Sequence, residues 1–213
     1  KNQSKREKIL KNKQKVLNDQ VIKKAFELQA QGRKFEAAKC YADLIEQGIK
    51  DCRIFSNYGI FLNEIGKYRE AELELKKAIS LNPNYANAHY NLAVLSIGQG
   101  NLEKAELELK KAVTLKSDFA IAYYNLGFIL QELGRLKEAE SFFQKTLKVN
   151  PQFTDAYFSL STLQSIDTNK RYHTQLFSES LLKNKNNREL VNIFFARSNI
   201  FDRECKYQES AEN

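Results

Sequence analysis

The sequence repeats itself with a fixed period of 34 residues. The stretch "FSNYGIFLNEIGKYREA" (55–71) returns 34 residues later as "HYNLAVLSIGQGNLEKA" (89–105), and after 34 more as "YYNLGFILQELGRLKEA" (123–139). A period of this size is typical of repeat proteins, in which each unit packs only on its neighbours. A single unit is too small to bury its apolar side, so we expect stacked units with one continuous core.

Each unit predicts two amphipathic helices joined by a glycine. In the first helix, apolar residues recur at spacings of three, four and seven, as Phe55, Tyr58 and Leu62 show. Glycine adopts the left-handed conformation that ends a helix at little cost. The three glycines in this position are Gly66, Gly100 and Gly134. A second helix follows, for example "YREAELELKKAISL", and Pro83 and Pro151 end two of these second helices.

Small residues recur in register on both helices. They are Gly59, Ala93 and Gly127 on the first helix and Ala71, Ala105 and Ala139 on the second. Small side chains let two helices approach closely, so these positions predict the interface within each hairpin. We expect the acidic residues of "EAELELKK" on exposed faces, where Glu and Lys four residues apart support the helix.

This pattern resembles the tetratricopeptide repeat family, most closely over residues 52–153. The resemblance extends backward to "VIKKAFELQAQGRKFEAAKCYADLIEQG" and forward to a first helix at 154–164. Its partner, "NKRYHTQLFSESLLKNK", has His173 in place of the small residue and reads as degenerate. The stretch "VNIFFARSNIFDRECKYQES" looks like the first helix of a sixth unit and the start of its second. The family implies an all-α fold, an α-solenoid of tandem helix-turn-helix hairpins forming a right-handed superhelix.

Three regions are predicted along the chain. Residues 1–18 form a basic, helical N-terminal extension, residues 19–167 an array of about four and a half repeats, and residues 168–213 degenerate repeat-like helices. The chain begins without Met and ends inside an apparent repeat. We therefore expect it to be a piece of a longer protein.

Charge and composition limit the function classes. Residues 1–24 hold nine Lys or Arg and two acids, whereas the rest is nearly neutral, although the chain as a whole carries +8. The basic stretch could bind phosphate or an acidic partner; the alternative, which we favour, is a solvated helix. No apolar run approaches the roughly 20 residues that span a bilayer. Three cysteines without metal-ligand spacing predict reduced thiols in a cytoplasmic protein.

In the family, one stripe of the first helix lines a concave groove that holds peptides or partner helices. Asn is constant in this stripe through three units, and its carboxamide can pair with both N–H and C=O of an extended peptide. The predicted binding residues are Arg53, Asn57, Ile60, Tyr90, Asn91, Val94, Tyr124, Asn125, Phe128 and Phe158. The alternative for the Asn set is a bond to a neighbouring loop, and for the tyrosines packing between repeats.

The resulting functional prediction is a scaffold that binds a protein or peptide. We find no catalytic or metal-binding pattern and expect neither a cofactor nor enzymatic activity, nor a nucleic-acid or membrane partner. The scarcity of Lys and Arg in the stripe argues against the C-terminal carboxylates that chaperone-binding members clamp. An alternative is an accessory arm of a larger enzyme, because the array loosely resembles bacterial arrays, cyanobacterial ones among them, that precede a sulfotransferase-like domain. In the family, arrays attached to glycosyltransferases use asparagine ladders to hold extended peptides. The oligomeric state is left open.

Overall fold

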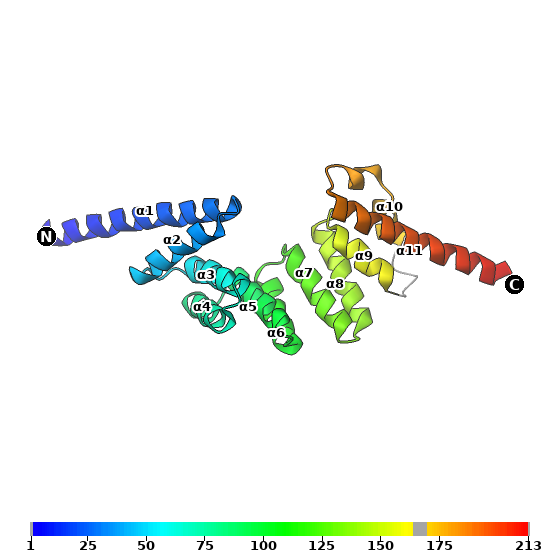
Figure 1. The fold of residues 1–213 in the computed structure, drawn as a ribbon, viewed down its shortest axis with the longest axis horizontal. Coiled ribbons are helices and arrows are strands. Elements are labelled where there is room, and N and C mark those ends of the chain that lie inside the picture. The colour runs from blue at the N-terminus through cyan, green and yellow to red at the C-terminus, as the bar shows by residue number, and fades with distance from the viewer. Residues whose placement is uncertain (1, 164–169, 213) are drawn as a thin grey trace. The chain divides into compact units, whose positions relative to one another are not determined.

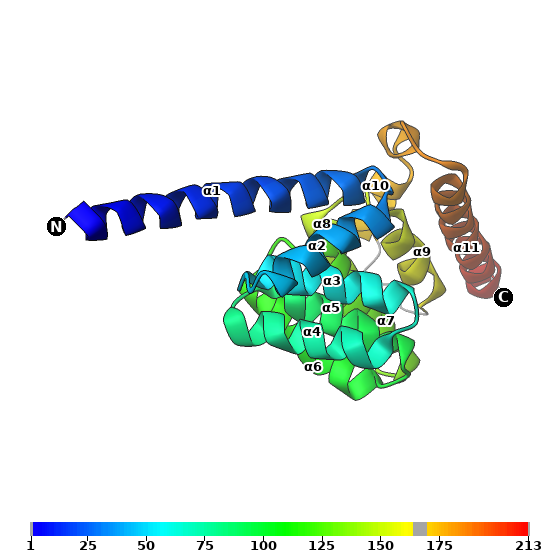
Figure 2. The same ribbon diagram turned by 60° about the vertical axis from the view of Figure 1, so that its left-hand side comes forward.

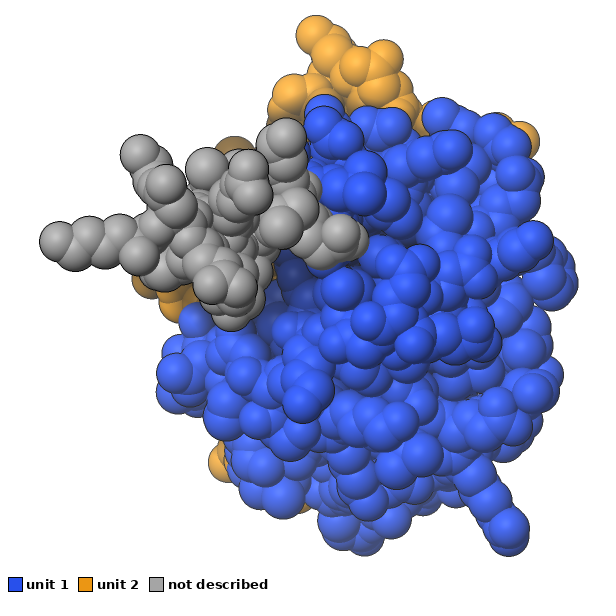
Figure 3. Space-filling view, turned by 90° about the vertical axis from the view of Figure 1, so that its left-hand side faces the viewer, with its two compact units in different colours: residues 1–115 blue, residues 116–213 orange. Residues whose placement is uncertain are grey.

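The computed structural model describes residues 2–163 and 170–212, with the side chains of 16–163, 172–203 and 205. Throughout this part of the chain the secondary structure is helical, and no strand occurs in it. The helices form two compact units, residues 1–115 and 116–213, which are coloured separately in Figure 3. The predicted helix end at Gln164 and the boundary between 167 and 168 lie outside the described residues.

The first unit consists of three helical hairpins stacked in chain order (Figure 1). Its helices are α1 (Asn2–Ala30), α2 (Lys34–Glu46), α3 (Cys52–Glu64), α4 (Tyr68–Leu81), α5 (Ala86–Gly98) and α6 (Leu102–Leu115). The helices α1 and α2, α3 and α4, and α5 and α6 pair as hairpins. Each hairpin packs on the next through α2 and α3, and through α4 and α5. This arrangement confirms the predicted all-α solenoid of hairpins.

The basic N-terminal segment is continuous with the first helix of the first hairpin. The helix α1 runs without a break from Asn2 to Ala30. Figures 1 and 2 both show its N-terminal half extending beyond α2. At the start of the described side chains, Val16 and Leu17 are exposed, whereas Ile22 and Ala25 are buried against the hairpin core.

The predicted helix ends are confirmed by the backbone. Gly66, Gly100 and Gly134 have φ of 80°, 74° and 72°, the left-handed region in which a side chain is strained. The helix α4 ends at Leu81, two residues before Pro83. Proline cannot continue a helix, and it disfavours helical geometry in the residue before it.

The interface within each hairpin forms where the small residues were predicted. A Cβ placed on Gly59 would lie 2.8 Å from Cγ of Leu75 and 3.3 Å from the carbonyl oxygen of Ala71. Leu75 and Ala71 are fully buried, in one cluster with Leu62. The small residues therefore let the two helices of a hairpin touch along their backbones, and the apolar side chains close around this contact.

The second unit begins with a complete hairpin and ends with a different arrangement. Its elements are α7 (Ala120–Glu132), α8 (Leu136–Val149), α9 (Thr154–Thr162), α10 (Lys170–Leu176), the 3-10 helix η1 (Glu179–Leu182) and α11 (Asn187–Glu212). The partner of α9 is short, as the degenerate sequence implied, and α11 packs directly on α9. Where the sequence was read as the end of one helix and the start of another, α11 is a single helix, because neither glycine nor proline interrupts it.

Candidate peptide-binding face

In the first unit, the predicted stripe lies on α3 and α5, which contact each other. Asn57, Ile60, Tyr90, Asn91 and Val94 are all half-buried, so they belong neither to the core nor to the fully exposed surface. The neighbouring first helices therefore present these residues along one partly accessible face.

Arg53, also predicted for this stripe, is held by acids of its own unit. Its guanidinium pairs with the carboxylate of Asp51 at 2.6 Å and with that of Asp19 at 3.4 Å. Asp51 also caps α3, since its side chain accepts a hydrogen bond from the backbone N–H of Arg53. Hydrogen bonds from Arg53 outweigh burial, so the pKa of Asp51 lies below its usual value. Much of the binding capacity of Arg53 is thus already used.

The carboxamide of Asn57 takes part in a short polar chain with the preceding hairpin. Its Nδ2 donates to the hydroxyl of Tyr41 at 3.3 Å, and that hydroxyl donates to Oε1 of Gln29 at 3.0 Å. Burial raises the pKa of Tyr41 to about 12, so the phenol keeps its proton. Beside this chain lies a pocket of about 10 Å³, room for about one water molecule, lined by Gln29, Tyr41, Asn57, Ile60 and other residues.

The carboxamide of Asn91 makes the corresponding contact with α3. Its Nδ2 donates to Oγ of Ser56 at 2.9 Å. In both Asn57 and Asn91 one N–H is therefore engaged by a hydroxyl of the preceding hairpin. Within the part of the chain that the structure describes, the carbonyl oxygen and the second N–H of each amide make no further hydrogen bond, and these are the groups that a ligand could use.

In the second unit, the predicted residues Tyr124, Asn125 and Phe128 lie on α7, and Phe158 lies on α9. Tyr124 and Asn125 are half-buried, whereas Phe128 and Phe158 are exposed. The ring of Tyr124 packs on Phe153, with centroids 5.0 Å apart. Burial raises the pKa of Tyr124, although a hydrogen bond with Ser159 acts in the opposite direction. Tyr124 thus combines packing between repeats with partial access.

The helix α11 adds residues to this face that the sequence reasoning missed. Nδ2 of Asn192 donates to Oδ1 of Asp155 at 2.8 Å, and the rings of Phe158 and Phe195 meet edge to face at 6.5 Å. Both contacts join residues 37 apart, whereas the central units repeat every 34. A search for the paired aromatics Tyr123-Tyr124, Tyr157-Phe158 and Phe194-Phe195 would have found this register.

A polar pocket opens at the N-terminal ends of α9 and α11. Its volume is about 380 Å³, and it is lined by Asn150, Gln152, Phe153, Thr154, Asp155, Asn186, Arg188, Glu189 and Asn192. The guanidinium of Arg188 is largely exposed and lies 3.9 Å from Asp155. The aromatic edge of Phe158 and Phe195 lies one helical turn along the same two helices. The second unit therefore combines an apolar edge with polar groups on one face.

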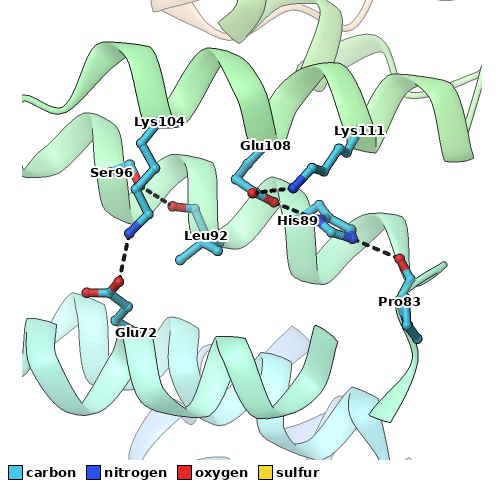
Figure 4. Close-up of polar contacts among 8 residues, drawn as sticks. All are labelled: Glu72, Pro83, His89, Leu92, Ser96, Lys104, Glu108 and Lys111. Carbon is cyan, nitrogen blue, oxygen red and sulfur yellow. Dashed lines mark hydrogen bonds and ion pairs between the residues drawn. The ribbon is translucent and has the colours of Figure 1, made fainter. Parts of the chain in front are cut away.

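A buried polar cluster lies inside the third hairpin of the first unit (Figure 4). Nδ1 of His89 lies 2.6 Å from Oε2 of Glu108, and Nε2 lies 2.8 Å from the carbonyl oxygen of Pro83. Lys111 donates to the other oxygen of Glu108 at 2.8 Å. Burial raises the pKa of Glu108, but the bonds from His89 and Lys111 outweigh it, so the pKa lies below its usual value. Every polar atom of this cluster has a structural partner.

In "EAELELKK" (70–77), Glu70 is exposed as expected, whereas Glu72 and Glu74 are half-buried. In the equivalent stretch "KAELELKK" (104–111), Glu106 and Glu108 are buried. Both lie on α6, where the carboxylate of Glu106 pairs with Lys110 at 2.6 Å and that of Glu108 pairs with Lys111 at 2.8 Å. Among the described residues, no three His, Cys, Asp or Glu side chains are grouped to hold a metal ion. No helix of this part of the chain is both long enough and apolar enough to cross a membrane.

Comparisons with known families agree with the stacked hairpins. Models described as tetratricopeptide repeat match residues 64–113 and 120–153, and one described as TPR repeat matches residues 97–134. The chain is therefore a tetratricopeptide repeat protein. No curated protein sequence matches it.

Several solved structures share this fold. The chain is 21% identical to MamA, with a TM-score of 0.59 over 86% of this chain and 97% of that one. It is 16% identical to PilF of Pseudomonas aeruginosa, with a TM-score of 0.67 over 90% of each chain. It is 20% identical to YrrB, which is described as a TPR protein with an unusual peptide-binding site. The TM-score is 0.57 over 84% of this chain and 85% of that one. At these identities the similarity establishes the fold alone.

Proposed function

We propose that this chain is a protein-interaction scaffold that binds peptides or partner segments on the faces that the first helices form within each unit. The observation that carries the proposal is the half-buried amide pair, Asn57 and Asn91, each with an unused carbonyl oxygen and N–H beside accessible apolar side chains. Phe128, Phe158 and Phe195 supply the apolar contact in the second unit. The peptide-binding site described for YrrB supports the same class of function.

Amides alone are insufficient for tight binding. Each net hydrogen bond contributes about 0.5–1.5 kcal/mol, whereas a micromolar dissociation constant needs about 8 kcal/mol. Aromatic side chains have to supply much of the rest, because they bury large apolar areas at little entropic cost. In the first unit, Tyr90 is the aromatic residue beside the amides, and in the second unit the aromatic residues of the face are Tyr124, Phe128, Phe158 and Phe195.

The test separates ligand contact from contact between hairpins. Peptides selected from a random phage-displayed library on the intact chain would be measured against two variants. Asn57→Ala with Asn91→Ala removes the amides, whereas Tyr41→Phe with Ser56→Ala removes only their hydroxyl partners. We expect the first variant to lose peptide affinity and the second to retain it. If both variants bind as the unmodified chain does, the amides do not contact the ligand.

The second candidate, an accessory arm of a larger sulfotransferase-like or glycosyltransferase-like enzyme, uses the same binding face. Its support is the resemblance of the opening and closing segments to arrays that precede such domains. The complete reading frame decides it, because a catalytic domain would be encoded in the same frame.

A further inference from the structure

One side of α11 carries two exposed aromatic rings, Phe194 and Phe201. The contacts between α9 and α11 place Phe195 in register with Phe158, since these residues lie 37 apart and their rings touch. By this register, Phe194 corresponds to Tyr157 and, through the period of 34, to Phe55 and His89. The other equivalences needed here are Ser198 with Gly59, Ala93 and Gly127, and Phe201 with Leu62, Ser96 and Leu130.

In the hairpins, the equivalent residues are covered. Phe55 is 8% exposed and Leu62 is 2% exposed. On α11, by contrast, Phe194 is 54% exposed and Phe201 is 53% exposed. The small position between them, Ser198, is also exposed, although its counterparts Gly59 and Gly127 are buried. The surface that elsewhere forms the inside of a hairpin is therefore open on α11.

The complete hairpins show what covers this surface. In the hairpins α3–α4, α5–α6 and α7–α8, the second helix packs one stripe of residues on the first. The stripe consists of a small residue, a large apolar residue four positions later and a small residue three positions after that. The stripes are Ala71, Leu75 and Ala78; Ala105, Leu109 and Ala112; and Ala139, Phe143 and Thr146, and all are buried. This spacing is one face of an amphipathic helix.

The exposed face is also held in a fixed arrangement. The guanidinium of Arg197 donates to the carbonyl oxygens of Leu176 and Ser178 and stacks over the rings of Phe177 and Phe194. The ring of Phe201 meets Phe177 edge to face at 5.0 Å. Because these rings are already ordered, a docking helix would meet a prepared surface.

We propose that this face, formed by Phe194, Ser198 and Phe201, docks an amphipathic helix of a partner protein that carries the small-x3-large-x2-small stripe. The partner helix thereby completes a hairpin with α11. This site is separate from the peptide-binding face, because Phe195, on the neighbouring side of α11, contacts Phe158 of α9.

The probe is a fluorescent peptide with the sequence of residues 102–115, which carries the stripe. A control peptide replaces Leu109 and Ala112 by Gln. We expect the intact chain to bind the first peptide saturably, with a gain in peptide helicity, and not the control. Isolated helices of this length are marginal in water, so the helicity gain reports docking. The peptide should also slow alkylation of Cys205, an exposed thiol seven residues beyond Ser198.

Three variants of the chain locate the site. Phe194→Ser with Phe201→Ser should weaken peptide binding at least about tenfold, because burial of two large apolar side chains is lost. Ser198→Phe should weaken it similarly by keeping the backbones apart. Phe35→Ser, which removes an exposed ring on α2 of the first unit, is the matched control and should leave affinity unchanged.

Several outcomes would overturn the proposal. These are absence of saturable binding, equal binding of the control peptide, or loss of binding in Phe35→Ser alone. Sedimentation adds a further test. If the chain dimerises and Phe194→Ser with Phe201→Ser abolishes the dimer, a second copy covers this face instead of a partner helix. None of these results affects the amide test of the peptide-binding face, so the two proposals fail independently.

Discussion

Nδ1 of His89 lies 2.6 Å from the buried Oε2 of Glu108, and this pair has no counterpart one repeat earlier. There, Glu74 and Lys77 occupy the positions of Glu108 and Lys111, but Phe55 stands where His89 would be. Lys77 donates to Oε1 of Glu74 at 2.8 Å, whereas Oε2 is buried without a hydrogen-bond partner. Two neighbouring hairpins thus carry a glutamate at the same repeat position. Both carboxylate oxygens of Glu108 have hydrogen-bond partners, whereas only one oxygen of Glu74 does.

Replacing His89 by Phe should reproduce the half-satisfied state in the third hairpin. Oε2 of Glu108 would remain buried and lose its donor, and the carbonyl oxygen of Pro83 would lose its partner. Leaving a buried acceptor unsatisfied costs about 1–3 kcal/mol. We expect the free energy of unfolding, measured by urea denaturation, to fall by about that amount. An unchanged value would show that Lys111 alone satisfies the carboxylate.

The reverse change, Phe55→His, should stabilise the second hairpin. An imidazole at this position would place a donor near Oε2 of Glu74, by analogy with His89 and Glu108. A net hydrogen bond to a charged group contributes about 1.5–3 kcal/mol, part of which offsets the lost packing of Phe55 against Ala78. The free energy of unfolding should therefore rise, and Phe55→His with Glu74→Gln should show a smaller rise. A decrease in the single variant would mean that packing outweighs the new bond.

The fold was predictable from the sequence because its determinants are local. Glycine is required at φ near 75°, as at Gly66 and Gly134, and a small residue is required where Gly59 meets Leu75. Such requirements recur at one spacing and are therefore visible in one sequence. The stacking of hairpins follows from them, since each hairpin leaves an apolar side to cover.

The missed features depend on contacts between elements that the period does not encode. The burial of Glu108 depends on His89, which lies on another helix and differs in type from Phe55 and Tyr123. The residues that α11 adds to the candidate binding face were missed because residues of α11 pair with residues of α9 that lie 37 positions earlier, whereas the repeat period is 34. The hydrogen bond from Asn91 to Ser56 forms because α3 and α5 lie close together, and no local sequence pattern specifies this contact.

Acid should weaken the contact between the second and third hairpins. Hydrogen bonds from Lys104 and then Lys76 lower the pKa of Glu72 to about 2, from an ordinary value of 4.5. Lys104 lies on α6, 2.7 Å from the carboxylate on α4 (Figure 4). A lowered carboxyl pKa contributes stability that is fully present above pH 4.5 and is lost as pH falls toward 2.

The variant Lys104→Gln should therefore be less stable than the unmodified chain at neutral pH, by less than about 1 kcal/mol because the pair is partly exposed. The difference should shrink as pH falls toward 2. Lys76→Gln is the control within one helix, because Lys76 pairs with Glu72 on α4 itself. Urea denaturation across this pH range measures both. A difference between Lys104→Gln and the unmodified chain that is independent of pH would contradict the assignment.

Gly127 should tolerate no side chain, although it lies inside a helix where alanine is intrinsically favoured. A Cβ at this position would lie 2.7 Å from the ring of Phe143 and 3.2 Å from the carbonyl oxygen of Ala139. Overpacking of this kind costs about 1–3 kcal/mol, which exceeds the helix-propensity gain of at most about 1 kcal/mol. Gly98→Ala is the matched control, because a Cβ there meets nothing within 4 Å. We expect the melting temperature to fall in Gly127→Ala and to stay level or rise in Gly98→Ala; a rise in both would show that α7 and α8 can separate without cost.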